Sequence, residues 1–324
     1  MTVFHVAAEG YGQQISQEIL NWAKEKLTRE VVAKLLLATD DKGRTLFHVA
    51  AEKYKLQTLR EILKCAKEKL TTEEITKFLL ATDDKGRKIF HAAADIYELQ
   101  ILQEILKWAK EKLTSEEINK LLLATDHEKM TAWHVIAKRG KLELLEKIRD
   151  LAEQNLTIEE IKNKLLFTTD NMGRTVLHMA AETNKLQILQ EILKWAKEKL
   201  TTEEKTKFLL VTDQKGMTVF HVAANTYELQ ILHEILKWAK EILTTEEMNN
   251  KLLLVADHKG RTFFHVAVEG NKLYILQEII MWAKEKLTTE EINKILLATD
   301  EKGRTVFHLA EMTYQLEMLK EMLK

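Results

Sequence analysis

Hydrophobic residues recur at helical spacing along the chain, and residues 83–126 show the pattern clearly. Between residues 99 and 113, apolar positions follow one another three or four apart in two stripes, which predicts a helix covered on two sides. A shorter apolar face over 88–95 predicts another helix before it. The polar segment 83–87 carries Gly86, which suits a tight turn with a residue at positive φ. The pattern therefore predicts a turn followed by two helices.

A third helix is predicted after residue 113. Thr114 and Glu117 have the spacing of a capping box, in which each side chain accepts a bond from a free backbone N–H at the helix start. Leu121 and Leu122 continue at helical spacing. Glutamate pairs recur at this place in six copies: Glu73/Glu74, Glu116/Glu117, Glu159/Glu160, Glu203/Glu204, Glu246/Glu247 and Glu290/Glu291. Because acidic residues stabilise the first turn of a helix, these pairs need no catalytic explanation.

The whole pattern repeats every 43 or 44 residues and is marked by eight periodic histidines. These are His5, His48, His91, His134, His178, His221, His265 and His308. Such a period is typical of a solenoid, in which each unit buries its apolar faces against its neighbours. We predict an all-α chain of tandem three-helix repeats joined by tight turns. It would form one continuous array over 1–324, with repeats at 1–39, 40–82, 83–125, 126–169, 170–212, 213–256, 257–299 and 300–324.

The stretch "DDKGRTLFHVAAEKYKLQTLREIL", residues 40–63, resembles an ankyrin repeat. The likeness lies in the D-x-x-G-x-T turn, the T-x-x-H start of the first helix, the paired alanines and the leucine-rich second helix. It implies an ankyrin-like helical solenoid whose periodic histidines hydrogen-bond within and between repeats. The family's proline after the threonine is missing, and its glycine between the helices survives only as Gly140. The period also exceeds the usual length of about 33 residues, and we attribute the surplus to an extended second helix and an added third one.

The periodic histidines do not suggest a metal site. Neighbouring helices pack about 8–10 Å apart, whereas a metal needs its ligands within about 2 Å. Three further histidines lie off this period, and we expect His127, His233 and His258 at the surface. We expect no metal and no cofactor.

Catalysis has little support in the sequence. Cys65 stands in the column that holds Trp22, Trp108, Trp195, Trp238 and Trp282 in other copies, so we predict a buried packing residue rather than a nucleophile. No phosphate-binding loop or nucleophile elbow is present. We therefore predict that the protein is not an enzyme.

The balance of basic and acidic residues bears on the class of partner that the protein can bind. Forty-nine basic and fifty acidic residues give a formal charge of −1, which creates no global attraction for nucleic acid or an anionic membrane. A single cysteine and the absence of a long apolar run favour an intracellular, cytoplasmic protein without a membrane span. The charge balance therefore argues against nucleic acid as a partner, and the resemblance to ankyrin repeats implies a protein or peptide.

Two sets of residues are candidates for binding it. The first is a basic ladder of turn-tip arginines, expected to be exposed and remote from the core: Arg44, Arg87, Arg174, Arg261 and Arg304, accompanied by Lys42, Lys85, Lys215, Lys259 and Lys302. These residues either form a solvated rim or grip an acidic peptide or phosphate groups. The second set lies at the outward ends of the first helices and varies between copies: Lys53, Ile96, Lys138, Arg139, Thr183 and Thr226. Variation there suits a recognition surface, and neutral drift at exposed sites would also produce it.

The resemblance implies a scaffold that binds partner proteins through these turn tips and helix ends. A structural or elastic spacer is one alternative. Another is the repeat region of a larger effector or toxin, because the chain begins inside a repeat and stops in a second helix, as an excised piece or an engineered array would.

The fourth repeat departs most from the pattern. Lys129 stands where the turn glycine belongs, and the third helix has one extra residue, as in the sixth repeat. One residue rotates the following helix face by about 100°, so we expect a bulge or shift. This repeat is then either a bend in the array or the centre of a binding site, unless it has merely diverged.

Overall fold

The computed structural model describes residues 2–10, 13–96, 99–244, 247, 252–312 and 315–323. Helices make up 70% of the chain, and the described residues contain isolated β-bridges but no strand, which confirms the all-α class. The chain divides into two compact units, Met1–Leu165 and Leu166–Lys324. The prediction of one continuous array stays a prediction.

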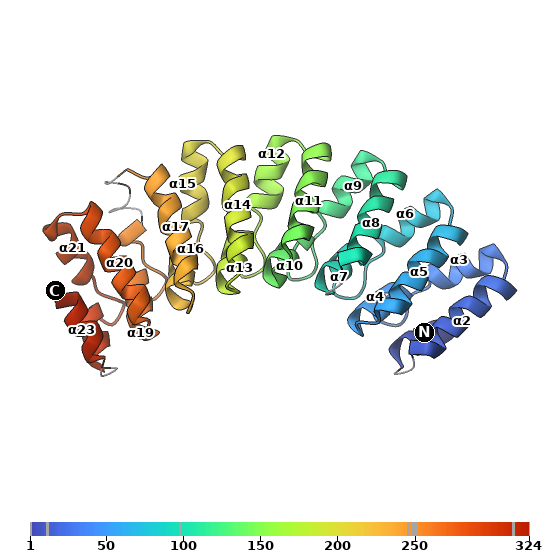
Figure 1. Cartoon of the computed structure of the whole chain (residues 1–324), viewed down its shortest axis with the longest axis horizontal. Helices are drawn as coiled ribbons and strands as arrows, with labels where there is room; N and C mark the ends of the chain where they lie inside the picture. The colour runs from blue at the N-terminus through green and yellow to red at the C-terminus, as the bar shows by residue number, and fades with distance from the viewer. Residues whose placement is uncertain are drawn as a thin grey trace. The chain divides into compact units, whose positions relative to one another are not determined.

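The first unit contains four sets of three α-helices (Figure 1). They are α1 (Val3–Glu9), α2 (Gln13–Lys26), α3 (Arg29–Leu37), α4 (Leu46–Glu52), α5 (Leu56–Lys69), α6 (Thr72–Leu80), α7 (Ile89–Asp95), α8 (Leu99–Lys112), α9 (Ser115–Leu122), α10 (Ala132–Arg139), α11 (Leu142–Asn155) and α12 (Ile158–Ile161). A π-helix, η1 (Lys162–Leu166), follows α12.

The second unit repeats this order. Its described helices are α13 (Val176–Glu182), α14 (Leu186–Lys199), α15 (Thr202–Leu210), α16 (Val219–Asn225), α17 (Leu229–Ile242), α19 (Phe263–Glu269), α20 (Leu273–Lys286), α21 (Thr289–Leu296), α22 (Val306–Met312) and α23 (Leu316–Leu323).

Equivalent helices of successive repeats pack against one another within each unit. In the first unit α1, α4, α7 and α10 are in contact in that order, as are α2, α5, α8 and α11. Third helices also pack against the second helix of the following repeat: α3 does so on α5, α6 on α8, α9 on α11 and α15 on α17. In the second unit α13, α16, α19 and α22 form the corresponding row. Second helices are therefore covered on two sides, as their two apolar stripes predict.

The tryptophan column lies between second and third helices. Trp238 of α17 meets Phe208 of α15 edge-on, with ring centroids 6.4 Å apart. Cys65 in the same column is also buried, and burial raises the pKa of its thiol, which fits the predicted packing role. Trp22 is the exception at 53% exposure.

The periodic histidines tie successive turns together. His48 Nε2 donates to the backbone carbonyl of Arg87 at 3.0 Å, and its Nδ1 accepts from the backbone N–H and hydroxyl of Thr45. The network thus assigns the proton to Nε2. The same bond to the next turn is made by His5 (2.9 Å), His91 (3.1 Å), His178 (3.2 Å), His221 (3.0 Å) and His265 (3.2 Å). The predicted hydrogen bonding within and between repeats is therefore confirmed, and His127, His233 and His258 are exposed as expected.

The capping boxes of the third helices are also confirmed. Glu74 accepts from the backbone N–H of Thr71 at 2.8 Å, and Thr71 Oγ1 accepts from the backbone N–H of Glu74 at 3.2 Å. The same reciprocal pair occurs at Thr114/Glu117, Thr157/Glu160, Thr201/Glu204, Thr244/Glu247 and Thr288/Glu291.

The extra residue of the fourth repeat is absorbed by a bulge, as expected. The third helix changes from α-helical to π-helical at Lys162, and the wider turns of η1 take up one residue. The bend and the binding centre proposed for this repeat stay predictions. The corresponding insertion in the sixth repeat falls largely on residues 248–251, outside the described residues.

Four of the described turns between first and second helices keep a left-handed residue, although the glycine expected from the resemblance is mostly absent; the turn between α16 and α17 does not, since Tyr227 has no positive φ. Gly140 has φ 74°, and Tyr54, Asn184 and Asn271 adopt φ values of 52°, 56° and 54°. The loss of glycine has therefore left the backbone conformation of these turns unchanged.

Lys129 also adopts a positive φ, 58°, at the place of the usual turn glycine. Substituting Lys129→Gly should stabilise the first unit by about 0.5–1 kcal/mol, because relief of left-handed strain outweighs the added entropy of the unfolded chain. Urea unfolding of the two proteins measures this difference. A loss of stability would mean that the exposed lysine makes a contact worth more than its strain.

No helix within the described ranges is both long and apolar enough to cross a membrane.

Candidate partner-binding surface

The turn-tip arginines are less exposed than the sequence analysis expects. Their side chains are 8–23% exposed at Arg44, Arg87, Arg174, Arg261 and Arg304. Each guanidinium faces the aspartate that begins its own turn. The expectation of freely exposed arginines remote from the core is therefore wrong.

The turns that contain Arg44 and Arg87 show why these side chains are buried. Asp40 Oδ1 accepts from the backbone N–H groups of Lys42 and Arg44, both at 2.9 Å, and its Oδ2 accepts from Arg44 Nε at 2.8 Å. Glu52 bridges two turns, pairing with Arg44 at 2.7 Å and with Arg87 at 2.5 Å. Burial alone would raise the pKa of Asp40, but its bonds to Arg44 outweigh burial and hold that pKa below its ordinary value. The arginines thus neutralise buried carboxylates and order the turns.

The fourth repeat shows the turn without this arginine. Met130 stands in its place, and burial raises the pKa of Asp126, because the backbone N–H groups of Glu128 and Met130 and the more distant charge of Arg87 do not outweigh it. In the second unit, Arg174 pairs with Asp170 at 2.7 Å and with Glu182 at 2.7 Å.

The free positive charge of the turns comes from lysines instead. The exposed residues are Lys42, Lys85, Lys215, Lys259 and Lys302. Of these, Lys85 lies 3.9 Å from Glu52. A basic edge is therefore present, but ammonium groups supply it.

The first-helix residues fall into two groups. Lys53 and Lys138 are exposed, Thr183 is half-buried, and Arg139 pairs with Asp95 at 2.5 Å. The other two are buried: Ile96 at 1% and Thr226 at 7% exposure. Helix α7 ends at Asp95 and the backbone of Ile96 is extended, so this side chain enters the core, whereas the Thr226 hydroxyl bonds the carbonyl of Ala223. Ile96 and Thr226 are thus wrongly predicted to point outward.

Two grooves of the second unit connect the turn tips with the ends of first helices. One of ≈ 510 Å³ is lined by Arg261, Glu269 and Lys259, and one of ≈ 280 Å³ by Arg174 and Thr226, among others. Lys215, Met217 and Asn225 line both grooves. Arg174 and Arg261 of the first predicted set and Thr226 of the second therefore line two grooves that share residues. We call this concave surface, lined by the residues named here, the turn-tip surface.

Tyr227 is a candidate that the sequence analysis misses. Its side chain is 86% exposed and lines the smaller groove together with Met172, which is 38% exposed. The ammonium group of Lys272, from the following repeat, lies over the Tyr227 ring. Tyrosines held in place in this way are frequent anchors of protein interfaces. The only sequence signal is a large aromatic residue at a position where the family has glycine.

No cluster of three or more histidine, cysteine, aspartate or glutamate side chains within the described part of the chain is arranged to hold a metal ion. No family model matches the chain, and no curated protein matches it in sequence. Its own residues therefore carry the functional inference.

Proposed function

We propose that the chain is an ankyrin-like helical solenoid that binds a partner protein or peptide and has no enzymatic activity. The rows of equivalent helices and the histidine bonds between successive turns support the solenoid architecture within each unit. Extended stacks of this kind offer a long concave surface for binding.

The turn-tip surface is the observation that carries this function. It combines a fixed, exposed aromatic ring at Tyr227 with adaptable methionine side chains at Met172 and Met217. Lys215 and Lys259 contribute positive charge with no ion-pair partner among the described residues, while the arginine beside them is neutralised. An acidic partner fits this surface best.

The test compares wild type with two groove variants, Tyr227→Ala and the double variant Lys215→Glu/Lys259→Glu. Partners captured on the immobilised chain are purified and their affinities measured. Tyr227→Ala should weaken binding about tenfold or more, as loss of an interface anchor does. The lysine variant should weaken it most at low salt, because exposed charges are screened over about 10 Å at 0.1 M.

Lys194→Glu/Lys237→Glu is the matched control, since it makes the same charge change on exposed second-helix positions of the same unit. It should leave the affinity within about twofold, a difference of less than 1 kcal/mol. A purified partner that binds all three variants as tightly as wild type would rule out the turn-tip surface.

A further inference from the structure

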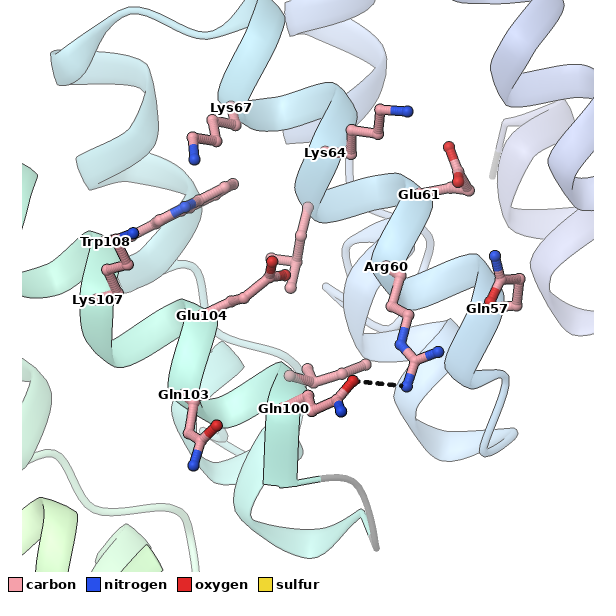
Figure 2. A pocket seen from close by; sticks show the side chains of 12 residues that line it. Gln57, Arg60, Glu61, Lys64, Lys67, Gln100, Gln103, Glu104, Lys107 and Trp108 are labelled. Atoms are coloured by element: carbon pink, nitrogen blue, oxygen red, sulfur yellow. Dashed lines mark hydrogen bonds between the residues drawn. The ribbon is translucent and has the colours of Figure 1, made fainter.

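A second concave surface lies on the second helices of the first unit, away from the turns. It is a groove of ≈ 650 Å³ between α5 and α8 (Figure 2). Its lining carries four cations, Arg60, Lys64, Lys67 and Lys107, against the carboxylates Glu61 and Glu104. One of these carboxylates is already engaged, because Glu61 pairs at 3.3 Å with Lys24 of α2. The groove therefore has an excess of positive charge.

Two of the cations are unpaired. The side chains of Lys64 and Lys67 are exposed, and neither ammonium group has a hydrogen-bond or ion-pair partner within the described ranges. The second unit differs at equivalent places: Lys197 of α14 forms an ion pair with Glu241, and Lys240 of α17 pairs with Glu285 at 2.6 Å. In the first unit Glu111 of α8, equivalent to these glutamates, instead lies 3.8 Å from Lys107 of its own helix. Among the described residues the helix pair α5/α8 thus lacks the ion pair that joins α14 to α17 and α17 to α20 at this position. It is joined instead by a hydrogen bond that Arg60 donates to Gln100 at 3.0 Å (Figure 2).

Trp108 supplies a hydrogen-bond donor at the wall of the groove. The residue is 4% exposed, yet it lines the groove, and its indole N–H can only donate a hydrogen bond. Figure 2 shows the ring reaching from α8 toward α5, with the Lys67 side chain pointing to it. An ammonium group and an indole N–H donor at one place favour an anionic oxygen, with which both form strong bonds.

We propose that the groove between α5 and α8 binds an acidic segment of a polypeptide, with a carboxylate held by Lys67 and the Trp108 indole N–H. A second carboxylate would lie by Lys64. Lys64 and Lys67 are three positions apart in α5 and so lie on the same face of this helix. The amides of Gln57 and Gln103 both donate and accept, and so suit the peptide backbone. Nucleic acid fits less well, because stacking needs an exposed aromatic face and the Trp108 ring is buried.

A fluorescein-labelled twelve-residue peptide of alternating Glu and Gly serves as the probe, with binding to the full chain followed by fluorescence anisotropy. Lys64→Gln/Lys67→Gln should weaken binding about tenfold, since two charge-assisted contacts are lost. Lys194→Gln/Lys197→Gln in α14, the same change at equivalent helix positions, should alter the affinity less than about twofold. If both double variants lose affinity for the peptide equally, the loss would reflect the overall charge of the protein and not this groove, which would overturn the proposal.

Trp108→Phe removes the indole N–H and keeps an aromatic ring in the core. It should weaken the peptide about threefold to tenfold, as loss of one hydrogen bond to a charged group does. Unchanged affinity would contradict the role given to Trp108. If thermal unfolding shows that this variant is misfolded, the exposed lysine pair decides the proposal alone. A single-stranded oligonucleotide of equal charge that binds as tightly as the peptide would also overturn it.

The result of this peptide-binding test does not depend on whether the turn-tip surface has the function proposed above. Lys215→Glu/Lys259→Glu changes the turn-tip surface of the other unit and should leave affinity for this probe unchanged. Failure of the α5/α8 groove therefore says nothing against the turn-tip surface, and the converse also holds.

Discussion

Acidification from pH 7 to pH 4.5 is expected to destabilise both units steeply, before the carboxylates paired with the turn arginines are protonated. The cause is the set of buried periodic histidines. Burial lowers the pKa of His48, His91 and His178 to about 4, and lowers the pKa of His221 and His265 as well. The hydrogen bonds described above require the neutral ring, with Nδ1 accepting.

The direction and size of this loss of stability follow from the difference in proton binding between the folded and unfolded chains. Above about pH 6.5 these histidines are neutral in both folded and unfolded chains, so their stabilising bonds are fully present. Between about pH 6.5 and 4 the unfolded chain takes up protons that folded His48, His91 and His178 exclude, and each of these three then costs about 1.4 kcal/mol per pH unit. At pH 5 this is about 2 kcal/mol for each of the three, against a typical total stability of about 5–15 kcal/mol. His221 and His265 add to the effect in the same direction.

Urea unfolding followed by circular dichroism at several pH values measures this effect. Asp40, Glu52, Asp257 and Asp300 all have lowered pKa values, so their contributions are lost only at still lower pH. His48→Gln/His91→Gln should be less stable at pH 7 but should depend less on pH between 7 and 5. An unfolding free energy that stays level over this range in wild type would contradict the assignment.

Much of the fold is predictable from local sequence. The helices, the capping boxes and the histidine positions depend on spacings of three, four and forty-three residues, and a single repeat carries all of these signals. The π-helix of the fourth repeat was also foreseeable as a bulge, because inserting one residue between fixed apolar contacts leaves few other solutions.

The binding residues were harder to predict. Turn position suggests exposure for Arg44, but the sequence does not reveal that the Asp40 carboxylate turns inward and that Glu52 from another element completes the cluster. Ile96 illustrates a second difficulty, since its burial depends on where α7 ends. The α5/α8 groove depends on which lysine meets which glutamate across two helices, and nearly identical helix sequences give different answers in the two units.

Trp238→Ala is expected to cost about 3–5 kcal/mol of folding free energy, the range found when buried aromatic residues are truncated in a core. The side chain is 5% exposed and meets Phe208 edge-on across α17 and α15. Its loss would leave a cavity between a second helix and the third helix of the preceding repeat. Hydrogen exchange should therefore show the largest loss of protection in α15 and α17, because neighbouring repeats contribute separately to stability.

Trp238→Phe separates packing from hydrogen bonding at this position. The indole N–H of Trp238 is buried and has no partner, so removing it sacrifices no bond. Phe retains most of the apolar volume and should cost less than about 1.5 kcal/mol, as moderate changes of shape in a core do. A loss below about 1 kcal/mol for the alanine variant would instead mean that the tryptophan column contributes little to the core, against the usual cost of such a cavity.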